Sequence, residues 1–525
     1  MIENYNLACA INHHRRMTPE ATAVVCQGQS LTYAELAEHG ARLAACLASS
    51  SGWQRDDGRP PRVGIFASRG IDACIAVLGA CWAGATYVPI GLKQPEERIL
   101  TVLGQCGLSA VIVDDEGMKL LTEHLLSACP QWVIHASQLT PVGRTTGSVQ
   151  LTARPPVVPE EPALMAASDT AYIIFTSGTT GVPKGVMISA GAVRHYVTMI
   201  AERLELRASD RALETCELSF DFSVHNMFST WEAGAALHIL PAATVMNAVK
   251  FARNSGLTVW NSVPSLAGML RQIKALVPGS LAALRVTVFG GEQLPASTLI
   301  AWQSAAPNSV IVNLYGPTEA TVFCLGQTVN VPLPLTPGRD VVAIGAPLPG
   351  NEASIVGEDD QPLPDGAPGE LLIAGKQLAD GYLEAPELNA ARFPTLNGKR
   401  WYRTGDLALR DTAGRFHCLG RIDNQVKVLG YRVELEEIDA HLRVVSGADV
   451  VGSVAWPLAD GMASGIVSFV DASAIAAERI IDLLKTRVPP YMLPNRIIFL
   501  KKMPLNPNGK VDRGTLRQLL EDAAA

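Results

Sequence analysis

The sequence predicts an α/β protein with a large N-terminal part and a separate, smaller α+β domain at its C-terminal end. Short apolar runs alternate with helical patterns over the first 135 residues and again from Tyr172 to about Gly326, the pattern of a parallel sheet covered by helices. From about Val342, short strand-like runs are divided by Gly and Pro turns, as in a small antiparallel unit. After Leu419–Asp423 the pattern changes again, and about 100 residues follow, enough for a further domain.

The individual elements follow from apolar periodicity. In the N-terminal part we expect strands over 21–26, 62–66 and 109–113, and helices over 33–48, 71–82 and 94–106. Residues 140–162 are rich in Thr, Pro, Gly and Val without a period, which indicates a surface connection. Further along we expect strands over 352–356, 370–373 and 426–428, a helix over 434–444, strands over 449–455 and 465–470, a helix over 474–486 and a closing loop.

Composition and charge exclude several classes of function. The 525 residues are 48% hydrophobic and 18% charged, which provides for a sizeable core and excludes a disordered chain. The net charge of −7 argues against nucleic-acid binding and against attraction to an anionic membrane. None of the ten cysteines lies at C-x-x-C spacing, so we expect no structural zinc. Without a signal-peptide pattern or an apolar run of bilayer length, we expect a cytoplasmic protein.

The strongest local signal is the segment Ile173–Val186, in which an apolar strand leads into the loop Thr176-Ser-Gly-Thr-Thr-Gly-Val-Pro-Lys184. Glycines let the backbone approach a phosphate closely, hydroxyls add donors and the lysine adds positive charge. Pro183 before Lys184 and Gly185 after it exclude the P-loop of nucleoside triphosphatases. A plain Gly/Thr turn is the alternative, but four hydroxyls and a lysine after an apolar strand favour a phosphate site.

Two further segments carry groups that suit a nucleotide. Asn313–Phe323 combines Tyr315, which can stack on a base, with Glu319, a carboxylate that can hold Mg²⁺; a strand end followed by a turn is the alternative. In Tyr402-Arg-Thr-Gly-Asp406, a carboxylate after a glycine turn suits a ribose diol. Taken alone, however, an Asp after Gly is usually a turn residue.

Two lysines lie in polar, turn-rich segments near the C-terminal end. They are Lys427, within Gly420–Gly430, and Lys510, within Pro504–Asp512. A surface lysine is common, but a lysine in a Pro/Asn/Gly loop of a mobile domain can be brought to an active site by closure.

Taken together and in this order, these segments resemble the adenylate-forming enzymes, and most closely the amino-acid adenylation domains of nonribosomal peptide and antibiotic biosynthesis. The resemblance runs from Leu31 to Lys510. It implies a large N-terminal domain over 1–422, made of two α/β subdomains plus a small β-barrel. It also implies a small mobile α+β domain over 423–525 that rotates about a hinge at Asp423.

The resemblance implies a ligase with two half-reactions. The carboxylate of an acid attacks the α-phosphorus of ATP, giving acyl-AMP and pyrophosphate, and a thiol then takes the acyl group. Lys510 matches the lysine that contacts the carboxylate and the α-phosphate, and Lys427 matches a lysine of the second, thioester-forming conformation. The matched nucleotide-binding positions are Thr176, Ser177, Gly178, Thr179, Thr180 and Lys184 for pyrophosphate, Gly291, Asn313 and Tyr315 for adenine, Thr318 for the α-phosphate, Asp406 and Arg421 for ribose, and Glu319 for Mg²⁺.

The substrate acid is indicated by Glu217–Phe228, in which Asp221 matches the aspartate that pairs with the α-ammonium of amino-acid substrates. An Asp that caps the following helix is the alternative. The other matched pocket positions are Phe222, His225, Asn261, Val288, Gly290, Leu314, Val322 and Phe323. They predict a small, mostly apolar pocket in which His225 and Asn261 bind a hydroxyl, each other or water. We expect a small L-amino acid, namely Thr, Val or 2-aminobutyrate.

The expected partner is a carrier protein. No carrier-type Gly-Gly-x-Ser site follows Lys510, so we expect a free-standing enzyme that loads a separate phosphopantetheinylated carrier protein in trans; the need for a small activator protein is open. Three alternatives are kept. An acyl- or aryl-CoA ligase is disfavoured by Asp221. A D-alanine–carrier protein ligase would differ only in its pocket and stereochemistry. A non-catalytic sensor would not need both Glu319 and Lys510.

Overall fold

The computed structural model describes residues 3–50, 53, 58–139, 157–178, 182–428, 430–459, 462–471, 475–506 and 511–524. The chain forms two compact units: unit 1 comprises 1–92, 103–174 and 185–419, and unit 2 comprises 93–102, 175–184 and 420–525. This mixed α/β organisation, with a large N-terminal and a smaller C-terminal part, confirms the predicted fold class. The boundary between 422 and 423 stays a prediction.

Unit 1 contains a nine-stranded sheet in the order β15-β14-β13-β12-β11-β9-β10-β1-β2. The strands from β13 to β1 are parallel, and the outer strands β15, β14 and β2 pair antiparallel. The strands are β1 (Thr22–Cys26), β2 (Gln29–Thr32), β9 (Arg211–Glu214), β10 (Ala236–Ile239), β11 (Val259–Ser262), β12 (Val286–Gly290), β13 (Val310–Tyr315), β14 (Leu325–Thr328) and β15 (Ala346–Pro347).

A second, seven-stranded sheet has the order β18-β8-β7-β4-β3-β5-β6. Its strands from β7 to β6 are parallel, and β18 pairs antiparallel with β8. They are β3 (Arg62–Phe66), β4 (Thr86–Pro89), β5 (Ala110–Val113), β6 (Val133–His135), β7 (Thr170–Thr176), β8 (Lys184–Ser189) and β18 (Gly381–Tyr382). The end of β7 and the start of β8 belong to unit 2.

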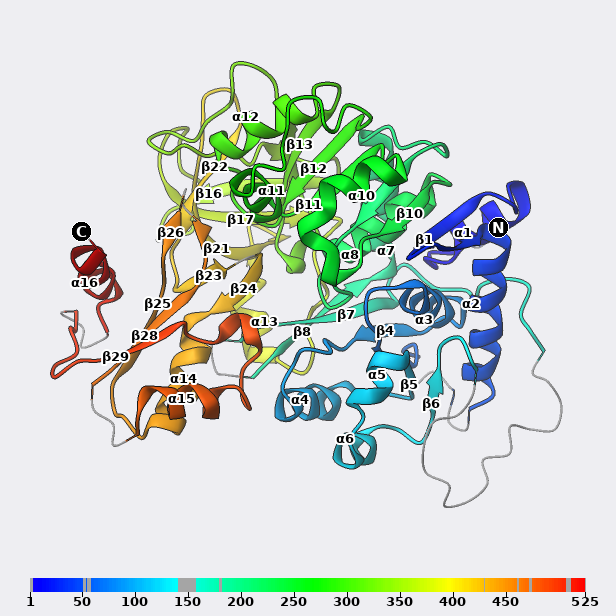
Figure 1. Ribbon diagram of the computed structural model, residues 1–525, viewed down its shortest axis with the longest axis horizontal. Coiled ribbons are helices and arrows are strands. Elements are labelled where there is room, and N and C mark those ends of the chain that lie inside the picture. Colours follow the sequence, from blue (N-terminus) through cyan, green and yellow to red (C-terminus); the bar gives the residue numbers. More distant parts are fainter. Residues whose placement is uncertain are drawn as a thin grey trace. The chain divides into compact units, whose positions relative to one another are not determined.

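Helices alternate with the strands of the two parallel sheets, as the sequence pattern predicts, while α1 precedes the first strand and α13 follows β18 (Figure 1). They are α1 (Cys9–Met17), α2 (Tyr33–Ala48), α3 (Ile71–Trp82), α4 (Glu96–Cys106), α5 (Asp115–Leu120), α6 (Glu123–Ala128), α7 (Ala190–Arg203), α8 (Phe222–Val224), α9 (Thr230–Glu232), α10 (Ala248–Ser255), α11 (Pro264–Gln272), α12 (Ala296–Ala305) and α13 (Pro386–Arg392). A π-helical turn over His225–Ser229 joins α8 to α9, so Phe222–Glu232 is one helical segment with an inserted residue, a feature frequent at functional sites.

The strands β11, β12 and β13, drawn in green in Figure 1, bury both faces. On one face, Trp260 and Phe289 pack against Trp302 of α12, with ring centroids 4.7 and 5.3 Å apart. Because side chains alternate along a strand, the intervening residues point to the opposite face. That face carries Val288 and Leu314, which belong to a different apolar cluster.

The predicted antiparallel unit is a four-stranded sheet in the order β16-β17-β21-β22. Its strands are β16 (Asn351–Val356), β17 (Gly369–Gly375), β21 (Tyr402–Arg410) and β22 (Phe416–Arg421), with the small hairpin β19 (Thr395–Leu396) and β20 (Lys399–Arg400) nearby in sequence.

Unit 2 contains a four-stranded sheet, β24-β23-β27-β26, and a three-stranded sheet, β25-β28-β29. Its elements are β23 (Gln425–Val428), β24 (Tyr431–Glu434), α14 (Leu435–Ser446), β25 (Val451–Ala455), β26 (Leu458–Ala459), β27 (Met462–Ala463), β28 (Ile466–Val470), α15 (Ala477–Leu484), β29 (Arg496–Phe499) and α16 (Arg513–Ala524). The expectation of a closing loop after residue 486 was wrong, because β29 extends a sheet and α16 packs Leu516 and Leu520 into an apolar cluster. Among the described residues, no helix has the length and apolar character to cross a membrane.

Candidate active site

Many of the predicted site residues lie where β11, β12 and β13 end. Asn261, Gly290 and Asn313 to Tyr315 are at or near the carboxyl ends of these parallel strands. Ligands of open α/β sheets bind outside these ends. The topology alone therefore supports a binding site at this edge.

Three aromatic side chains from the predicted pocket meet edge to face. The ring centroids of Phe222 and Phe323 are 5.0 Å apart, and His225 lies 5.5 Å from Phe222 and 5.7 Å from Phe323. All three are almost fully buried. Three of the predicted pocket residues therefore pack directly against one another.

Asp221 occupies the position before α8 but makes no side-chain capping hydrogen bond to that helix. The alternative of a capping aspartate is therefore not observed. Burial raises the pKa of Tyr87, Tyr172 and Tyr196 well above the usual value, and the Asp221 charge adds to each shift. Asp221 thus lies near enough to these three buried phenols to affect their pKa values.

Four pocket residues share one face of the sheet. Asn261 stands opposite Val288 in register, and Gly290 stands opposite Leu314; Val288 and Gly290 are two residues apart and so point the same way. A Cβ atom at Gly290 would lie 2.4 Å from the Phe323 ring. Because Gly290 has no side chain, the Phe323 ring can pack directly against the backbone of β12.

The segment that supplies Val322 and Phe323 has an unusual backbone. Thr321 and Val322 have φ of +52° and +65°, a region costly for β-branched residues. The buried Gln377 holds them: its amide nitrogen donates to the carbonyl oxygens of Ala320, Thr321 and Phe323 at 3.2, 3.1 and 2.8 Å. The Thr321 hydroxyl donates in return to the Gln377 carbonyl oxygen at 2.6 Å.

His225 is held by a residue that the sequence analysis did not name. The Tyr196 hydroxyl lies 2.7 Å from Nδ1 of His225. Burial lowers the pKa of His225 to about 3, and the neighbouring Asn261 side chain opposes this shift only partly. His225 is therefore a neutral imidazole.

One residue predicted to bind adenine, Tyr315, contacts one predicted to bind ribose, Asp406. The Tyr315 hydroxyl donates to the Asp406 carboxylate, and burial together with Asp406 raises the pKa of Tyr315 well above its usual value. Asn313 donates through Nδ2 to the carbonyl oxygen of Ala343 at 2.9 Å, while its buried Oδ1 has no hydrogen-bond partner among the described residues. Gly291 has φ of +83°.

Thr318 opens the short 3-10 turn Thr318–Ala320, and Glu319 within it is fully buried. The Tyr382 hydroxyl donates to Oε1 of Glu319 at 2.7 Å, which orients the carboxylate. Among the described residues no group of three or more His, Cys, Asp or Glu side chains is placed to hold a metal. Mg²⁺ is commonly bound by one or two carboxylates plus substrate phosphates, so the chemistry of the Glu319 carboxylate suits this ion.

The predicted phosphate loop lies in unit 2 where it is described. Gly178 has no room for a side chain, because a Cβ atom there would meet the Val182 carbonyl oxygen at 2.0 Å. Nζ of Lys184 lies 3.4 Å from Oε1 of Glu434. The Ser177 hydroxyl donates to the backbone carbonyl oxygen of Arg432 at 3.1 Å. The buried hydroxyl of Thr176 has no hydrogen-bond partner among the described residues.

A buried carboxylate also contacts this loop. Glu437 accepts from the backbone N–H of Gly178 at 3.2 Å and forms an ion pair with Arg98, both side chains being buried. Two glutamates, Glu434 and Glu437, therefore occupy donors of the loop. A bound polyphosphate would have to replace these contacts.

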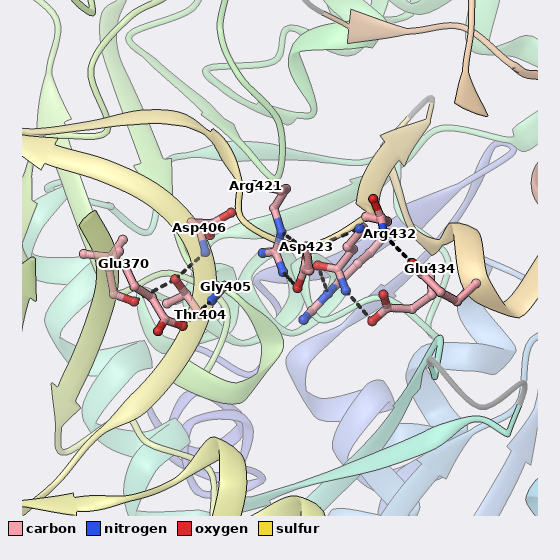
Figure 2. A network of polar contacts seen from close by, with 12 residues as sticks. Glu370, Thr404, Gly405, Asp406, Arg421, Asp423, Arg432 and Glu434 are labelled. Carbon is pink, nitrogen blue, oxygen red and sulfur yellow. Dashed lines mark hydrogen bonds and ion pairs between the residues drawn. The ribbon is translucent and has the colours of Figure 1, made fainter. Parts of the chain in front are cut away.

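The remaining predicted residues are partly described. Arg421 donates to Asp423 at 2.8 and 2.6 Å (Figure 2), so the predicted ribose contact and the predicted hinge are paired with each other. The expected glycine turn before Asp406 is not present, because Thr404, Gly405 and Asp406 all lie within β21; there the backbone N–H of Asp406 donates to the Thr404 hydroxyl at 2.9 Å (Figure 2). Lys427 lies exposed on β23. The predicted residues Thr179, Thr180 and Lys510 lie outside the described residues.

Comparison with known proteins assigns the class. The family model of the AMP-binding enzymes matches residues 11–383, and the chain belongs to this family. It is thus an adenylate-forming enzyme, as the resemblance implied, and enzymes of this family use ATP.

The more particular similarities are to peptide synthetases. The chain is 33% identical over 509 residues to tyrocidine synthase 3 of Brevibacillus parabrevis, covering 95% of this chain and 7% of that protein. It is 34% identical over 501 residues to surfactin synthase subunit 1 of Bacillus subtilis, covering 94% and 13%. The chain therefore spans only a small part of the length of these relatives.

A solved structure with a similar fold is the adenylation domain AlmE of Vibrio cholerae in complex with glycyl-adenosine-5'-phosphate. Its TM-score is 0.86 at 29% identity, and the match covers 99% of both chains.

Proposed function

We propose that this chain activates a small L-amino acid with ATP as aminoacyl-AMP and then transfers the aminoacyl group to the phosphopantetheine thiol of a separate carrier protein. The observation that carries this proposal is the position of Asp221. Its carboxylate lies just before α8 without capping that helix, beside the cluster of Phe222, His225 and Phe323. The α-ammonium of an amino acid is a cation that a carboxylate at this position can pair with. The glycyl-adenosine-5'-phosphate bound to AlmE supports the same chemistry.

In the first step, an oxygen of the amino-acid carboxylate bonds to the α-phosphorus of ATP while the bond from that phosphorus to the bridging oxygen breaks and pyrophosphate leaves. Such a transfer needs positioning and charge stabilisation. We assign Asp221 to the ammonium, the buried Asn313 Oδ1 to the adenine amine, and Asp406 to the ribose hydroxyls. We assign Lys510 to the carboxylate and α-phosphate. Mg²⁺ on Glu319 would neutralise phosphate charge.

The pocket residues favour Thr, Val or 2-aminobutyrate as the amino acid. The rings of Phe222 and Phe323 leave little volume, and Val288, Leu314 and Val322 are apolar. An acyl- or aryl-CoA ligase offers no cation to Asp221 and stays the less favoured alternative. A D-alanine–carrier protein ligase shares the chemistry and is separated by substrate stereochemistry.

The test is amino-acid-dependent exchange of labelled pyrophosphate into ATP, with all standard amino acids, 2-aminobutyrate and D-alanine. We expect exchange to peak at Thr, Val or 2-aminobutyrate. Asp221→Asn should raise KM for the amino acid at least tenfold, whereas Asp359→Asn, an exposed aspartate of unit 1, should leave it unchanged. Exchange with fatty or aryl acids but with no amino acid would overturn the proposal.

Two lysine variants separate the half-reactions. Lys510→Ala should reduce exchange by about 10²–10³-fold, the usual cost of one donor removed from developing charge. Lys427→Ala should leave exchange intact and slow the transfer of labelled amino acid to a phosphopantetheinylated carrier protein. Equal loss of both steps in Lys427→Ala would contradict a separate role in thiol transfer.

A further inference from the structure

We propose that Tyr196 is a positioning residue for substrate selectivity: it holds His225 in the tautomer that presents Nε2–H to a side-chain hydroxyl of the substrate, with Oδ1 of Asn261 accepting from that hydroxyl. The inference rests on the proposed function and narrows it to a β-hydroxy amino acid of the threonine type. Valine and 2-aminobutyrate, which have the same or nearly the same volume, become poorer substrates.

The first step is the direction of the hydrogen bond between Tyr196 and His225, whose atoms lie 2.7 Å apart. A phenol is a stronger donor than a neutral imidazole N–H, and an imidazole nitrogen is a stronger acceptor than a phenol oxygen. The Tyr196 O–H therefore donates to Nδ1 of His225. In a neutral imidazole one nitrogen carries the proton, and the bond at one nitrogen fixes the state of the other, so the proton is on Nε2.

The second step is that both groups offered to the substrate lack a partner. Nε2 of His225 and Oδ1 of Asn261 are buried, and neither makes a hydrogen bond of normal geometry among the described residues, although the Asn261 side chain lies near enough to oppose the lowering of the His225 pKa. His225 is 0% and Asn261 is 1% exposed. Buried polar groups are normally hydrogen-bonded, so a donor and an acceptor left open in the predicted pocket are themselves a sign of a missing ligand group.

The third step identifies that group. A hydroxyl has one donor hydrogen and two acceptor lone pairs, so it can accept from Nε2–H and donate to Oδ1 at once. Neither a methyl group nor a second ammonium can do both. The edge-to-face packing of Phe222 and Phe323 on His225 fixes the imidazole plane, so the position of the Nε2–H donor is fixed as well.

The fourth step is the charge state of His225. Burial holds its pKa at about 3, so the ring remains neutral at physiological pH and the choice between tautomers is real. Asp221, the residue just before α8, is assigned to the ammonium. The hydroxyl subsite therefore contains neutral groups only, which suits an alcohol and not a charged side chain.

The test compares kcat/KM for Thr, Val and 2-aminobutyrate in pyrophosphate exchange. The wild type should prefer Thr by at least tenfold, because a site built to hydrogen-bond a hydroxyl rejects analogues that lack it. Tyr196→Phe should lower kcat/KM for Thr at least tenfold, leave the value for Val within twofold, and thereby reduce the Thr/Val ratio. Equal losses for Thr and Val would show a purely structural role and overturn the inference.

The matched control is Tyr33→Phe. Tyr33 is also a fully buried tyrosine of unit 1, and its hydroxyl makes one hydrogen bond, to the carbonyl oxygen of Ala235 at 2.8 Å. This variant should lose similar thermal stability and keep the Thr/Val ratio of the wild type. A fall of the ratio in Tyr33→Phe of the same size would also overturn the inference.

A measurement on the wild-type protein keeps the inference testable if Tyr196→Phe does not fold. Nitrogen-15 NMR of histidine-labelled protein, with the His225 signals assigned by their loss in His225→Gln, should show protonated Nε2 and unprotonated Nδ1. Protonated Nδ1 would overturn the inference. A wild type that prefers Val over Thr would overturn it while leaving the proposed function standing, whereas no exchange with any amino acid would remove the proposed function itself.

Discussion

At the scale of single residues, the candidate active site contains polar side chains whose burial costs free energy of folding. His225 is the best example, because its ring is enclosed by Phe222, Phe323 and Tyr196 and has lost its ordinary basicity. An unperturbed histidine has a pKa of about 6.5, so the two values define a pH range in which the folded and unfolded states differ in bound protons.

This difference predicts how stability depends on pH. Between about 6.5 and 3, the unfolded chain binds a proton at His225 and the folded chain does not, so the free energy of unfolding falls as pH is lowered through this range. His225→Gln should show a smaller fall between pH 6.5 and 4.5 in urea unfolding. Parallel curves for the two proteins would contradict the burial of a neutral His225.

The comparison between variants isolates His225 from other groups. Glu214, for instance, has its pKa raised to about 7, mainly by burial. A raised pKa in a carboxyl contributes stability at low pH that is lost as pH rises through about 7. The two groups therefore act in opposite directions, and only the difference between wild type and His225→Gln reports on the histidine.

At the scale of elements, the loop between β13 and β14 depends on a residue outside it. Thr321 and Val322 hold positive φ angles, each costing about 1–3 kcal/mol. Gln377 holds the loop through three carbonyl oxygens. The pocket wall formed by Val322 and Phe323 is therefore positioned by Gln377 and not by its own sequence.

Gln377→Met keeps the length of the side chain and removes its donors. We expect a loss of about 2–4 kcal/mol in the free energy of unfolding, from the carbonyl groups left without a partner. We also expect relaxed discrimination between amino acids of different size, measured by exchange. The control is Gln327→Met, which removes a single bond from β14 to the Ala343 carbonyl oxygen and should change stability less and selectivity not at all.

The sequence predicted some helices and strands better than others, and the same holds for the residues of the candidate active site. Isolated amphipathic or apolar runs, such as α2, α3 and β3, matched their predicted bounds. β4 was not predicted because it follows α3 within one apolar stretch, where periodicity cannot separate helix from strand. β29 was missed because it is short and half exposed.

Within the site, the contiguous segments could be predicted because each combines residue types that one kind of ligand requires, such as glycines, hydroxyls and a lysine for phosphate. Tyr196 and Gln377 were not, because a tyrosine in the middle of α7 or a glutamine after β17 looks like any other. Only the fold brings Tyr196 to His225 across 29 residues and Gln377 to Phe323 across 54. Tyr382, which orients Glu319, belongs to the same class of partner.

At the scale of the whole molecule, ligand binding should appear as stability. A ligand that binds only the folded state adds about 2.7 kcal/mol at a concentration one hundred times its Kd. We expect a non-hydrolysable ATP analogue with Mg²⁺, and separately the preferred amino acid, to raise the thermal unfolding midpoint. Asp221→Asn should retain the shift caused by the nucleotide and lose most of the shift caused by the amino acid. An unchanged amino-acid shift in that variant would remove Asp221 from the binding site.

The close approach of Phe323 to Gly290 restricts how this pocket can evolve. Any side chain at residue 290 would collide with the ring, since even its Cβ atom would lie 2.4 Å away. The two positions are therefore expected to behave non-additively, and a new residue at 290 becomes tolerable only after Phe323 has been replaced by something smaller. When the enzyme evolves toward a different amino-acid substrate, Phe323 should therefore be substituted before Gly290. The order of substitutions then limits which substrate specificities related enzymes can reach.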